Sequence, residues 1–179
     1  MLKICSIIGQ IMILLLLILL INNIILSSTT IPIKIEEHEY TDPLFKEIEH
    51  HLLYLNAPED NLDQLINAIY LASNSTSLDC KLITSLMYTE SKFKLNAVGP
   101  QNKTDIRYKG LMQTPTASWF YDVDTLHGAR ILEEKLKISK NDLRLALALY
   151  KGGKNKMAFK QADDVLKIYQ NLQNYSISE

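Results

Sequence analysis

The sequence predicts a mainly α-helical fold, and three observations support this prediction. Apolar residues recur at helical spacing through most of the chain after residue 42, and Asp or Asn residues suited to capping precede several of these stretches. The segment LRLALALY, residues 143–150, is apolar almost all round, which is typical of a helix at the centre of a globule. Residues 95–118 contain Gly, Pro and Asn, and predict an irregular region or a small hairpin. We therefore expect helices packed around a central apolar helix.

The N-terminus carries the strongest compositional signal. Lys3 precedes an apolar stretch that is unbroken over Ile11–Ile21, a length typical of the central region of a signal peptide. Counted over Ile4–Leu26, the same stretch is just long enough to cross a bilayer as an anchor. Both interpretations of residues 1–28 stay open. Under both, the rest of the chain is exported to the periplasm or cell envelope, and an uncleaved segment anchors it in the inner membrane with the C-terminal part outside.

The first three predicted helices each follow capping signals. Asp42 caps the first helix, Pro43 occupies its first position, and the helix runs to about residue 56. The second follows Asp60. The third begins near Thr76, with Asp79 three residues on as in a capping box, and ends near residue 92. We divide the chain into a leader or anchor (1–28), a tether with the first helix (29–58) and a main domain (59–179).

Three further helices are predicted after the irregular segment. Asp124 can cap the fourth, which carries apolar residues at helical spacing up to Leu136. Asn141 can cap the fifth, the LRLALALY segment, which Gly152 and Gly153 bring to an end. The sixth is amphipathic and contains Val165, Leu166, Tyr169 and Leu172.

Composition and charge exclude some partners. The formal net charge of −1 gives no electrostatic basis for binding nucleic acid. Cys5 and Cys80 cannot pair within the fold if residues 1–28 are cleaved or embedded, so we expect Cys80 to be a small core residue. His50 and His51 lie near glutamates, but a solvated charged face explains them better than a metal site does. We expect no metal and no cofactor.

Glu90 interrupts an apolar stripe. In LITSLMYTE, residues 82–90, the spacing from Leu86 and Met87 places position 90 on the same helical face, where another Leu is expected. One interpretation is that the helix ends before Glu90 and the carboxylate points to water. In the other, Glu90 lies at the mouth of the core, where burial and the negative end of its helix raise its pKa. Such an acid can protonate the leaving oxygen of a glycosidic bond near neutral pH.

Three motifs occur in order from Glu90 onward. ES at Glu90–Ser91 is followed by Phe93, GLMQTP spans Gly110–Pro115, and ALALYKGG spans Ala146–Gly153. Together they resemble the catalytic domain of soluble-type lytic transglycosylases, relatives of goose-type lysozyme. ES-x-F resembles the catalytic glutamate motif of that family, GLMQ resembles its substrate-cleft motif, and LYKGG stands where the family usually has Ala-Tyr-Asn-(Ala/Gly)-Gly. The segment DTLHGARILEEKL, residues 124–136, resembles the intervening helix, so the resemblance covers about residues 77–155.

The resemblance implies an α+β lysozyme-like fold and an exported peptidoglycan lytic transglycosylase. Residues 59–179 are then the catalytic domain. The implied substrate is the glycan strand, cut between MurNAc and GlcNAc with formation of a 1,6-anhydro-MurNAc end, and Glu90 acts first as acid and then as base. The implied setting is a bacterial cell wall, a secretion system or a phage, with a secretion-system or virion partner left open.

The resemblance also implies which residues bind the substrate. Gln113 and the backbone of Gly110, Leu111 and Met112 are expected to line the cleft. Ser91 is expected to support Glu90 and the substrate, and Tyr150 to hydrogen-bond near Glu90 or the acetamido group. An ordinary core position is the alternative for Met112 and Tyr150, and for Met112 it is favoured. The aromatic cluster at 118–121 can stack on sugars, although packing is the commoner role in helical domains.

Lys151 departs from the family pattern, because an Asn usually stands at that place. A lysine near the end of a helix is stabilised by the helix dipole, so we expect Lys151 to point outward. The alternative is an inward side chain that contacts Glu90 and lowers its pKa.

Two other functions stay open. A hydrolase of the same bond would need a second carboxylate to hold a water opposite Glu90, and Asp105, Asp122 and Asp124 are candidates that the spacing does not separate. A non-catalytic, membrane-tethered protein that binds glycan or another partner would also fit a cleft altered by Lys151.

Overall fold

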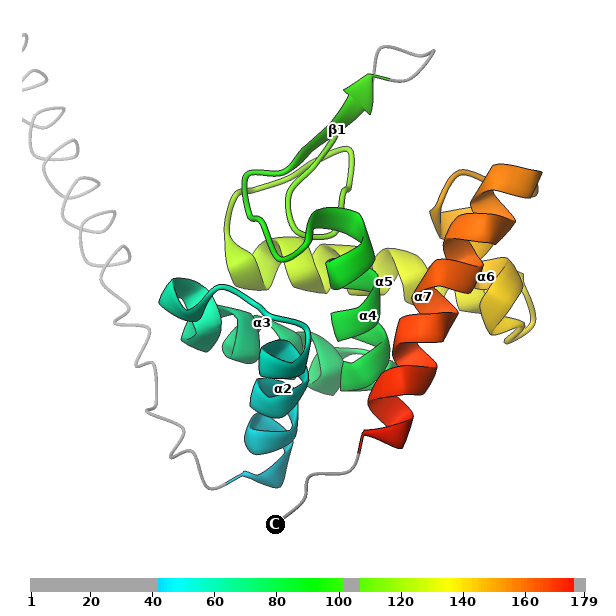
Figure 1. Ribbon diagram of the computed structural model, residues 1–179. Helices are drawn as coiled ribbons and strands as arrows, with labels where there is room; N and C mark the ends of the chain where they lie inside the picture. Colours follow the sequence, from blue (N-terminus) through cyan, green and yellow to red (C-terminus); the bar gives the residue numbers. More distant parts are fainter. Residues whose placement is uncertain (1–41, 102–106, 176–179) are drawn as a thin grey trace, which may run out of the picture. The chain divides into compact units, whose positions relative to one another are not determined.

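The computed structural model describes residues 42–101 and 107–175. The predicted signal or anchor segment, residues 1–28, lies outside these ranges. Within them the chain is mainly helical, as predicted, with six α-helices, α2 to α7, and one two-stranded sheet (Figure 1). In the described ranges no helix is both long and apolar enough to cross a membrane.

The first two helices begin near the predicted positions. α2 (Pro43–Tyr54) has Asp42 as its N-cap, and the Asp42 carboxylate accepts a hydrogen bond from the backbone N–H of Leu44 at 2.9 Å. A 3-10 turn, η1 (Glu59–Asn61), leads into α3 (Leu62–Ser75). Because α2 buries Phe45, Ile48 and Leu52, it belongs to the same hydrophobic core as the helices that follow.

Helix α4 (Cys80–Ser91) begins later than predicted. Asp79 is itself the N-cap, and its carboxylate accepts a hydrogen bond from the backbone N–H of Lys81 at 2.8 Å. Thr76, the predicted start, instead ends α3, and its hydroxyl donates to the carbonyl of Ala72 at 2.7 Å. The predicted capping box is therefore wrong, because the Thr76 hydroxyl bonds backward along the chain.

Helix α5 (Tyr121–Ile138) begins earlier than predicted, and Asp124 is not its cap. Phe120 is the N-cap, and Asp124 lies within the first turn with 2% of its surface exposed. The Asp124 carboxylate accepts hydrogen bonds from the backbone N and the Oγ of Ser118, at 2.6 and 2.8 Å. Asp124 therefore holds the loop before α5.

Gly152 and Gly153 lie in the short connection between the last two helices. α6 (Leu143–Tyr150) is capped by Asp142, not by Asn141, and the carboxylate of Asp142 accepts from Leu145 N at 2.9 Å. Gly152 and Gly153 end α6 as predicted. α7 (Lys156–Asn174) then completes the fold.

A small hairpin fills the predicted irregular region. β1 (Val98–Gln101) and β2 (Arg107–Lys109) pair antiparallel. The chain then turns at Gly110, which has φ of +78°, a value that glycine adopts without strain. A Cβ at Gly110 would lie 2.2 Å from Oδ2 of Asp124, so this backbone packs directly on α5.

The central helix is α4, so the prediction that LRLALALY is central is wrong. α4 packs against α2, α3, α5 and α7, whereas α6 packs mainly against α5 and α7 at one side of the domain (Figure 1). α6 is apolar apart from the exposed Arg144, and it is short and has a neighbouring helix on two sides. In α4, by contrast, every residue over Leu82–Met87 is buried.

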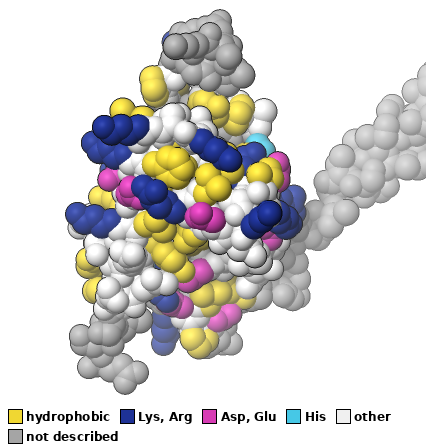
Figure 2. All heavy atoms as spheres, turned by 90° about the vertical axis from the view of Figure 1, so that its right-hand side faces the viewer, with side chains coloured by type: hydrophobic (Ala, Val, Ile, Leu, Met, Phe, Trp, Pro, Cys, Tyr) yellow, Lys and Arg dark blue, Asp and Glu magenta, His cyan; other side chains and the backbone are white. Residues whose placement is uncertain are grey.

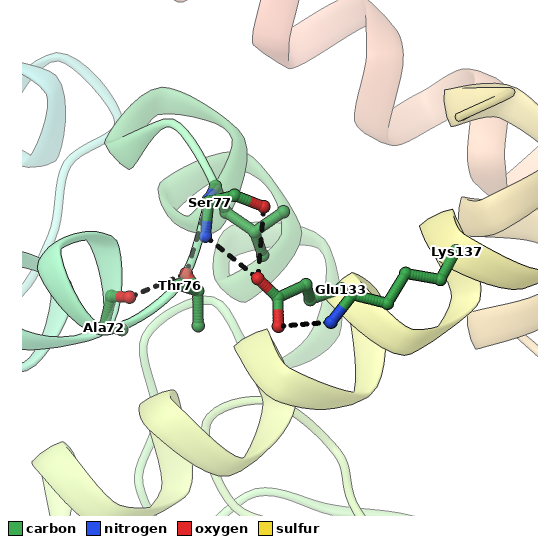
Figure 3. Close-up of polar contacts among 6 residues, drawn as sticks. Ala72, Thr76, Ser77, Glu133 and Lys137 are labelled. Carbon is green, nitrogen blue, oxygen red and sulfur yellow. Dashed lines mark hydrogen bonds and ion pairs between the residues drawn. The ribbon is translucent and has the colours of Figure 1, made fainter. Parts of the chain in front are cut away.

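A polar tie joins the end of α3 to α5 (Figure 3). Glu133 accepts hydrogen bonds from the backbone N and the Oγ of Ser77, both at 3.1 Å. Lys137 lies one turn further along α5, and its Nζ is 3.3 Å from Oε2 of Glu133. This tie adds to the direct packing of α3 against α5.

Charged side chains of both signs share the face of the molecule where α6 and α7 lie. Figure 2 shows Lys and Arg side chains on this face spread among acidic and apolar ones. One pair on it is bidentate: Nε and Nη2 of Arg144 lie 2.6 and 2.8 Å from the two carboxylate oxygens of Asp163.

Gly128 lets the GLMQ segment approach α5 closely, and we expect Gly128→Ala to be destabilising. A Cβ at position 128 would meet Cβ of Met112 at 2.3 Å and its Cγ at 2.6 Å. Overpacking of this kind should lower the free energy of unfolding by about 1 to 3 kcal/mol, measured by urea unfolding. Glu134→Ala, on the exposed side of α5, is the control and should change it by less than about 0.5 kcal/mol. Equal stabilities for the two variants would contradict the close approach.

Candidate active site

A cleft of about 670 Å³ opens beside Glu90. Its walls come from the end of α4, the hairpin, the turn at Gln113, the end of α6 and one side of α7. Distant parts of the sequence therefore meet here, including residues from all three motifs. The lining includes Glu90, Ser91, Gln113, Tyr150, Lys151, Gln161 and Asp164.

Glu90 lies within α4 and is largely buried, so the interpretation in which the helix ends before it is wrong. The helix continues to Ser91, and 12% of the Glu90 side chain is exposed. Burial raises the pKa of Glu90 above its usual range, and the nearby ammonium of Lys151 opposes this rise without cancelling it. The carboxyl thus keeps its proton to higher pH than an ordinary surface glutamate.

Lys151 points into the cleft, so the predicted outward direction is wrong. Its Nζ lies 2.9 Å from Oε1 of Glu90 and donates a hydrogen bond to Oγ1 of Thr89 at 3.1 Å. Only 7% of the Lys151 side chain is exposed. Lys151 is the C-cap of α6, where the dipole favours a cation but does not determine its direction. The buried carboxylate of Glu90 determines it, because a buried charge without a partner is costly.

Tyr150 and Gln113 brace the backbone of the GLMQ segment. The hydroxyl of Tyr150 donates to the carbonyl of Met112 at 2.7 Å. Nε2 of Gln113 donates to the carbonyls of Ala97 and Gly110, at 3.1 and 3.0 Å. Burial, with a smaller contribution from the charge of Glu90, holds the pKa of Tyr150 well above its usual range, so the phenol stays protonated as a donor. Both side chains shape the cleft and line it.

The other predicted cleft residues are buried to different degrees. Ser91 lines the cleft but is 6% exposed, and its hydroxyl donates to the carbonyl of Met87 at 3.2 Å. Gly110, Leu111 and Met112 are buried and are not among the lining residues. The side chains of Leu111 and Met112 belong to the hydrophobic core, as favoured for Met112.

The exposed aromatic residues of the 118–121 cluster lie outside the cleft lining, whereas Tyr108 of β2, 39% exposed, borders the cleft. Trp119 and Phe120 are 43% and 67% exposed, just before α5. Tyr121 instead packs against the core. The cleft lining therefore gives no support for stacking of Trp119, Phe120 or Tyr121 on a sugar held beside Glu90.

Helix α7 contributes Gln161 and Asp164, which the sequence interpretation missed. These positions flank the buried stripe of α7 that contains Ala162 and Val165, so they lie at the edge of its packed face. Their positions beside the buried stripe could have marked Gln161 and Asp164 as residues near the packed face of α7. The spacing alone does not indicate which cavity they border.

The predicted second carboxylates do not meet Glu90 in the cleft. Asp122 is exposed on α5, Asp124 is buried against the loop at Ser118, and Asp105 lies outside the described residues. Among the described acidic residues, Asp164 is the one that lines the cleft together with Glu90.

Tyr150→Phe tests the brace between α6 and the GLMQ segment. Removing the hydroxyl leaves the carbonyl of Met112 without this donor, and we expect a loss of about 1 to 2 kcal/mol in the free energy of unfolding. Tyr54→Phe is the control, because Tyr54 is 44% exposed, and it should change stability little. A Tyr150→Phe variant as stable as wild type would show that the brace contributes nothing to the fold.

The geometry is suited to general acid–base chemistry. A buried carboxyl with a raised pKa faces an open cleft, an ammonium adjoins it, and a phenol and an amide hold the neighbouring wall. Comparison with protein-family models, curated proteins and solved structures finds no match to this chain. Function is therefore inferred from this geometry together with the order of the motifs.

Proposed function

We propose that the chain is an exported peptidoglycan lytic transglycosylase with a lysozyme-like fold. It cleaves the glycan strand between MurNAc and GlcNAc and leaves a 1,6-anhydro-MurNAc end. The observation that carries the proposal is Glu90, a buried carboxyl with a raised pKa at the edge of a cleft that residues of all three motifs line. The setting is a bacterial cell envelope, a secretion system or a phage, with residues 1–28 as a signal peptide or membrane anchor.

The reaction requires one proton carrier. Protonated Glu90 donates its proton to the bridging oxygen as the bond from that oxygen to C1 of MurNAc breaks. The acetamido group of the sugar stabilises the oxocarbenium-like centre, so no protein nucleophile is needed. The Glu90 carboxylate then takes the proton of the C6 hydroxyl, whose oxygen bonds to C1 and closes the anhydro ring. One bond to C1 breaks, another forms, and no water is consumed.

Lys151 serves the second half of this reaction. After proton donation Glu90 is a carboxylate, and the ammonium 2.9 Å away stabilises that charge until the C6 hydroxyl returns a proton. The same ammonium opposes the acid step, because it favours the ionised form of Glu90. Burial outweighs it, since the pKa of Glu90 remains raised.

Lys151→Asn should move the basic limb of the activity profile upward. Without the ammonium, Glu90 keeps its proton to higher pH, and a shift of about one pH unit corresponds to about 1.4 kcal/mol of lost interaction. The measurement is the initial rate of muropeptide release as a function of pH. Lys154→Asn is the control, because Lys154 is exposed beyond α6, and it should leave both limbs in place. An unmoved basic limb in Lys151→Asn would contradict control of Glu90 by Lys151.

A hydrolase of the same bond is the second candidate, and Asp164 favours it. A hydrolase needs a carboxylate that activates or holds a water on the opposite side of the sugar from the acid. Asp164 borders the same cleft as Glu90 and comes from a different helix, so it can approach the substrate from another direction. A non-catalytic glycan-binding protein is the third candidate, favoured by the ion pair between Lys151 and Glu90.

Digestion of purified sacculi with the full-length chain separates these candidates. Mass analysis of the soluble muropeptides should show anhydro ends. Exclusively reducing ends, lost in Asp164→Asn, would replace the lyase with the hydrolase. Binding to sacculi without any release would favour the non-catalytic protein.

A further inference from the structure

Glu47, His51 and Cys80 form a cluster of potential metal ligands outside the cleft. A carboxylate oxygen, an imidazole nitrogen and Sγ all lie within 4.8 Å of one another. Glu47 and His51 stand one turn apart on α2 and so share a face, while Cys80 is the first residue of α4. None of the three lines the cleft beside Glu90. The sequence interpretation treated His51 as part of a solvated face and Cys80 as a core residue, and did not join them.

His51 gives the independent sign of a ligand. Its side chain is 2% exposed, and its Nδ1 has no hydrogen-bond partner among the described residues. Buried polar atoms are nearly always paired, so an unpaired nitrogen on an imidazole that lies beside a thiol and a carboxylate needs an explanation. A coordinated cation supplies one. Cys80, 3% exposed, is not in a disulfide, and its thiol hydrogen-bonds to the Asp79 side chain, a contact that an ion bound to Sγ would replace.

The ammonium of Lys81 lies at one side of this cluster. Its Nζ is paired with Oε1 of Glu47, and 23% of the Lys81 side chain is exposed. The ammonium thus sits at the rim, on a flexible chain that can move to water when another cation binds Glu47. The carboxylate of Asp79, next to Cys80 in the chain, adds negative charge nearby that favours a cation.

We propose that Glu47, His51 and Cys80 bind a divalent cation of the zinc class. One nitrogen, one sulfur and one carboxylate oxygen form a donor set that Zn²⁺ accepts, with water as the fourth ligand. The bound ion ties α2 to the first turn of α4, the helix that carries Glu90 in its last turn. Its role is structural, and it is independent of the reaction proposed at Glu90.

Cobalt(II) titration of the metal-free, full-length chain tests this site. A thiolate bound to Co²⁺ absorbs in the near ultraviolet, and Zn²⁺ should remove the absorption by competition. We expect this absorption in the wild type and in Cys5→Ser, and its loss in Cys80→Ser. Absorption that persists in Cys80→Ser, or disappears in Cys5→Ser, would overturn the proposal.

Two matched pairs of variants sharpen the test. His51→Gln should weaken Co²⁺ binding by at least about tenfold, whereas His50→Gln, its neighbour outside the cluster, should leave it unchanged. Lys81→Met should strengthen binding by at least about threefold, because it removes the competing cation. This gain keeps the test decisive if Cys80→Ser does not fold. Absence of thiolate absorption in both wild type and Lys81→Met would overturn the site.

Discussion

Glu90→Gln should lower the rate of muropeptide release from purified sacculi by at least about 10²-fold. General acid–base catalysis contributes about 10² to 10⁴-fold, and here one carboxyl serves both steps. The amide keeps the shape of Glu90 and can still accept a hydrogen bond from Lys151, but it cannot transfer a proton. The loss should appear in the maximal rate at every pH, because no protonation state of the amide restores the acid.

Glu134→Gln is the matched control for this loss. It makes the same chemical change at an exposed carboxylate on α5, outside the cleft lining, and should retain wild-type activity. Near wild-type turnover in Glu90→Gln, with the control also active, would contradict the catalytic role of Glu90.

Lys151→Met should lower the free energy of unfolding by about 3 kcal/mol near pH 8, because breaking a buried ion pair leaves the other charge uncompensated. Lys151 and Glu90 are 7% and 12% exposed, so water can compensate little of the remaining charge. Glu90→Gln should cost less, since its amide oxygen still accepts from Lys151. The double variant removes both charges and should recover most of the loss, with a coupling energy of about 1 to 3 kcal/mol in urea unfolding.

The loss in Lys151→Met should depend on pH with a definite sign. Burial raises the pKa of Glu90 in the folded state, so its stabilising contribution is fully present below the unfolded pKa and is lost as pH rises through the folded pKa. Removing the ammonium raises the folded pKa further. The deficit should therefore be small near pH 4 and largest near pH 8. The same deficit at both pH values, or strict additivity in the double variant, would contradict the ion pair.

The start of α2 could be predicted from the sequence, whereas the caps of α4 and α6, Asp79 and Asp142, were missed although they too act locally. Asp42 followed by Pro43 marks the first turn of α2, because capping involves residues close in the chain. Helical spacing likewise placed Glu90 on the buried face of α4, because Leu86 and Met87, one turn before it on that face, are apolar. The start of α5 was missed, since Asp124 looks like a cap locally and is instead held by Ser118 in the preceding loop.

Features that depend on tertiary partners could not be predicted. The dipole of α6 favours a cation at its end whether the Lys151 side chain points inward or outward. The position of Glu90 on α4 selects the inward direction. The centre of the core is a similar case, because the nearly all-round apolarity of α6 does not indicate how many helices surround it. Asp164 borders the cleft only because α7 folds back beside α4 and α6.

Digestion of sacculi in water enriched in ¹⁸O tests the central claim most directly. In the proposed reaction the C6 oxygen of MurNAc bonds to C1, so no oxygen from water enters the new end. Mass analysis should therefore find anhydro ends without ¹⁸O, and their release should depend on Glu90. One ¹⁸O atom in each new end, on a product heavier by one water, would contradict the lytic transglycosylase and show that water attacks C1.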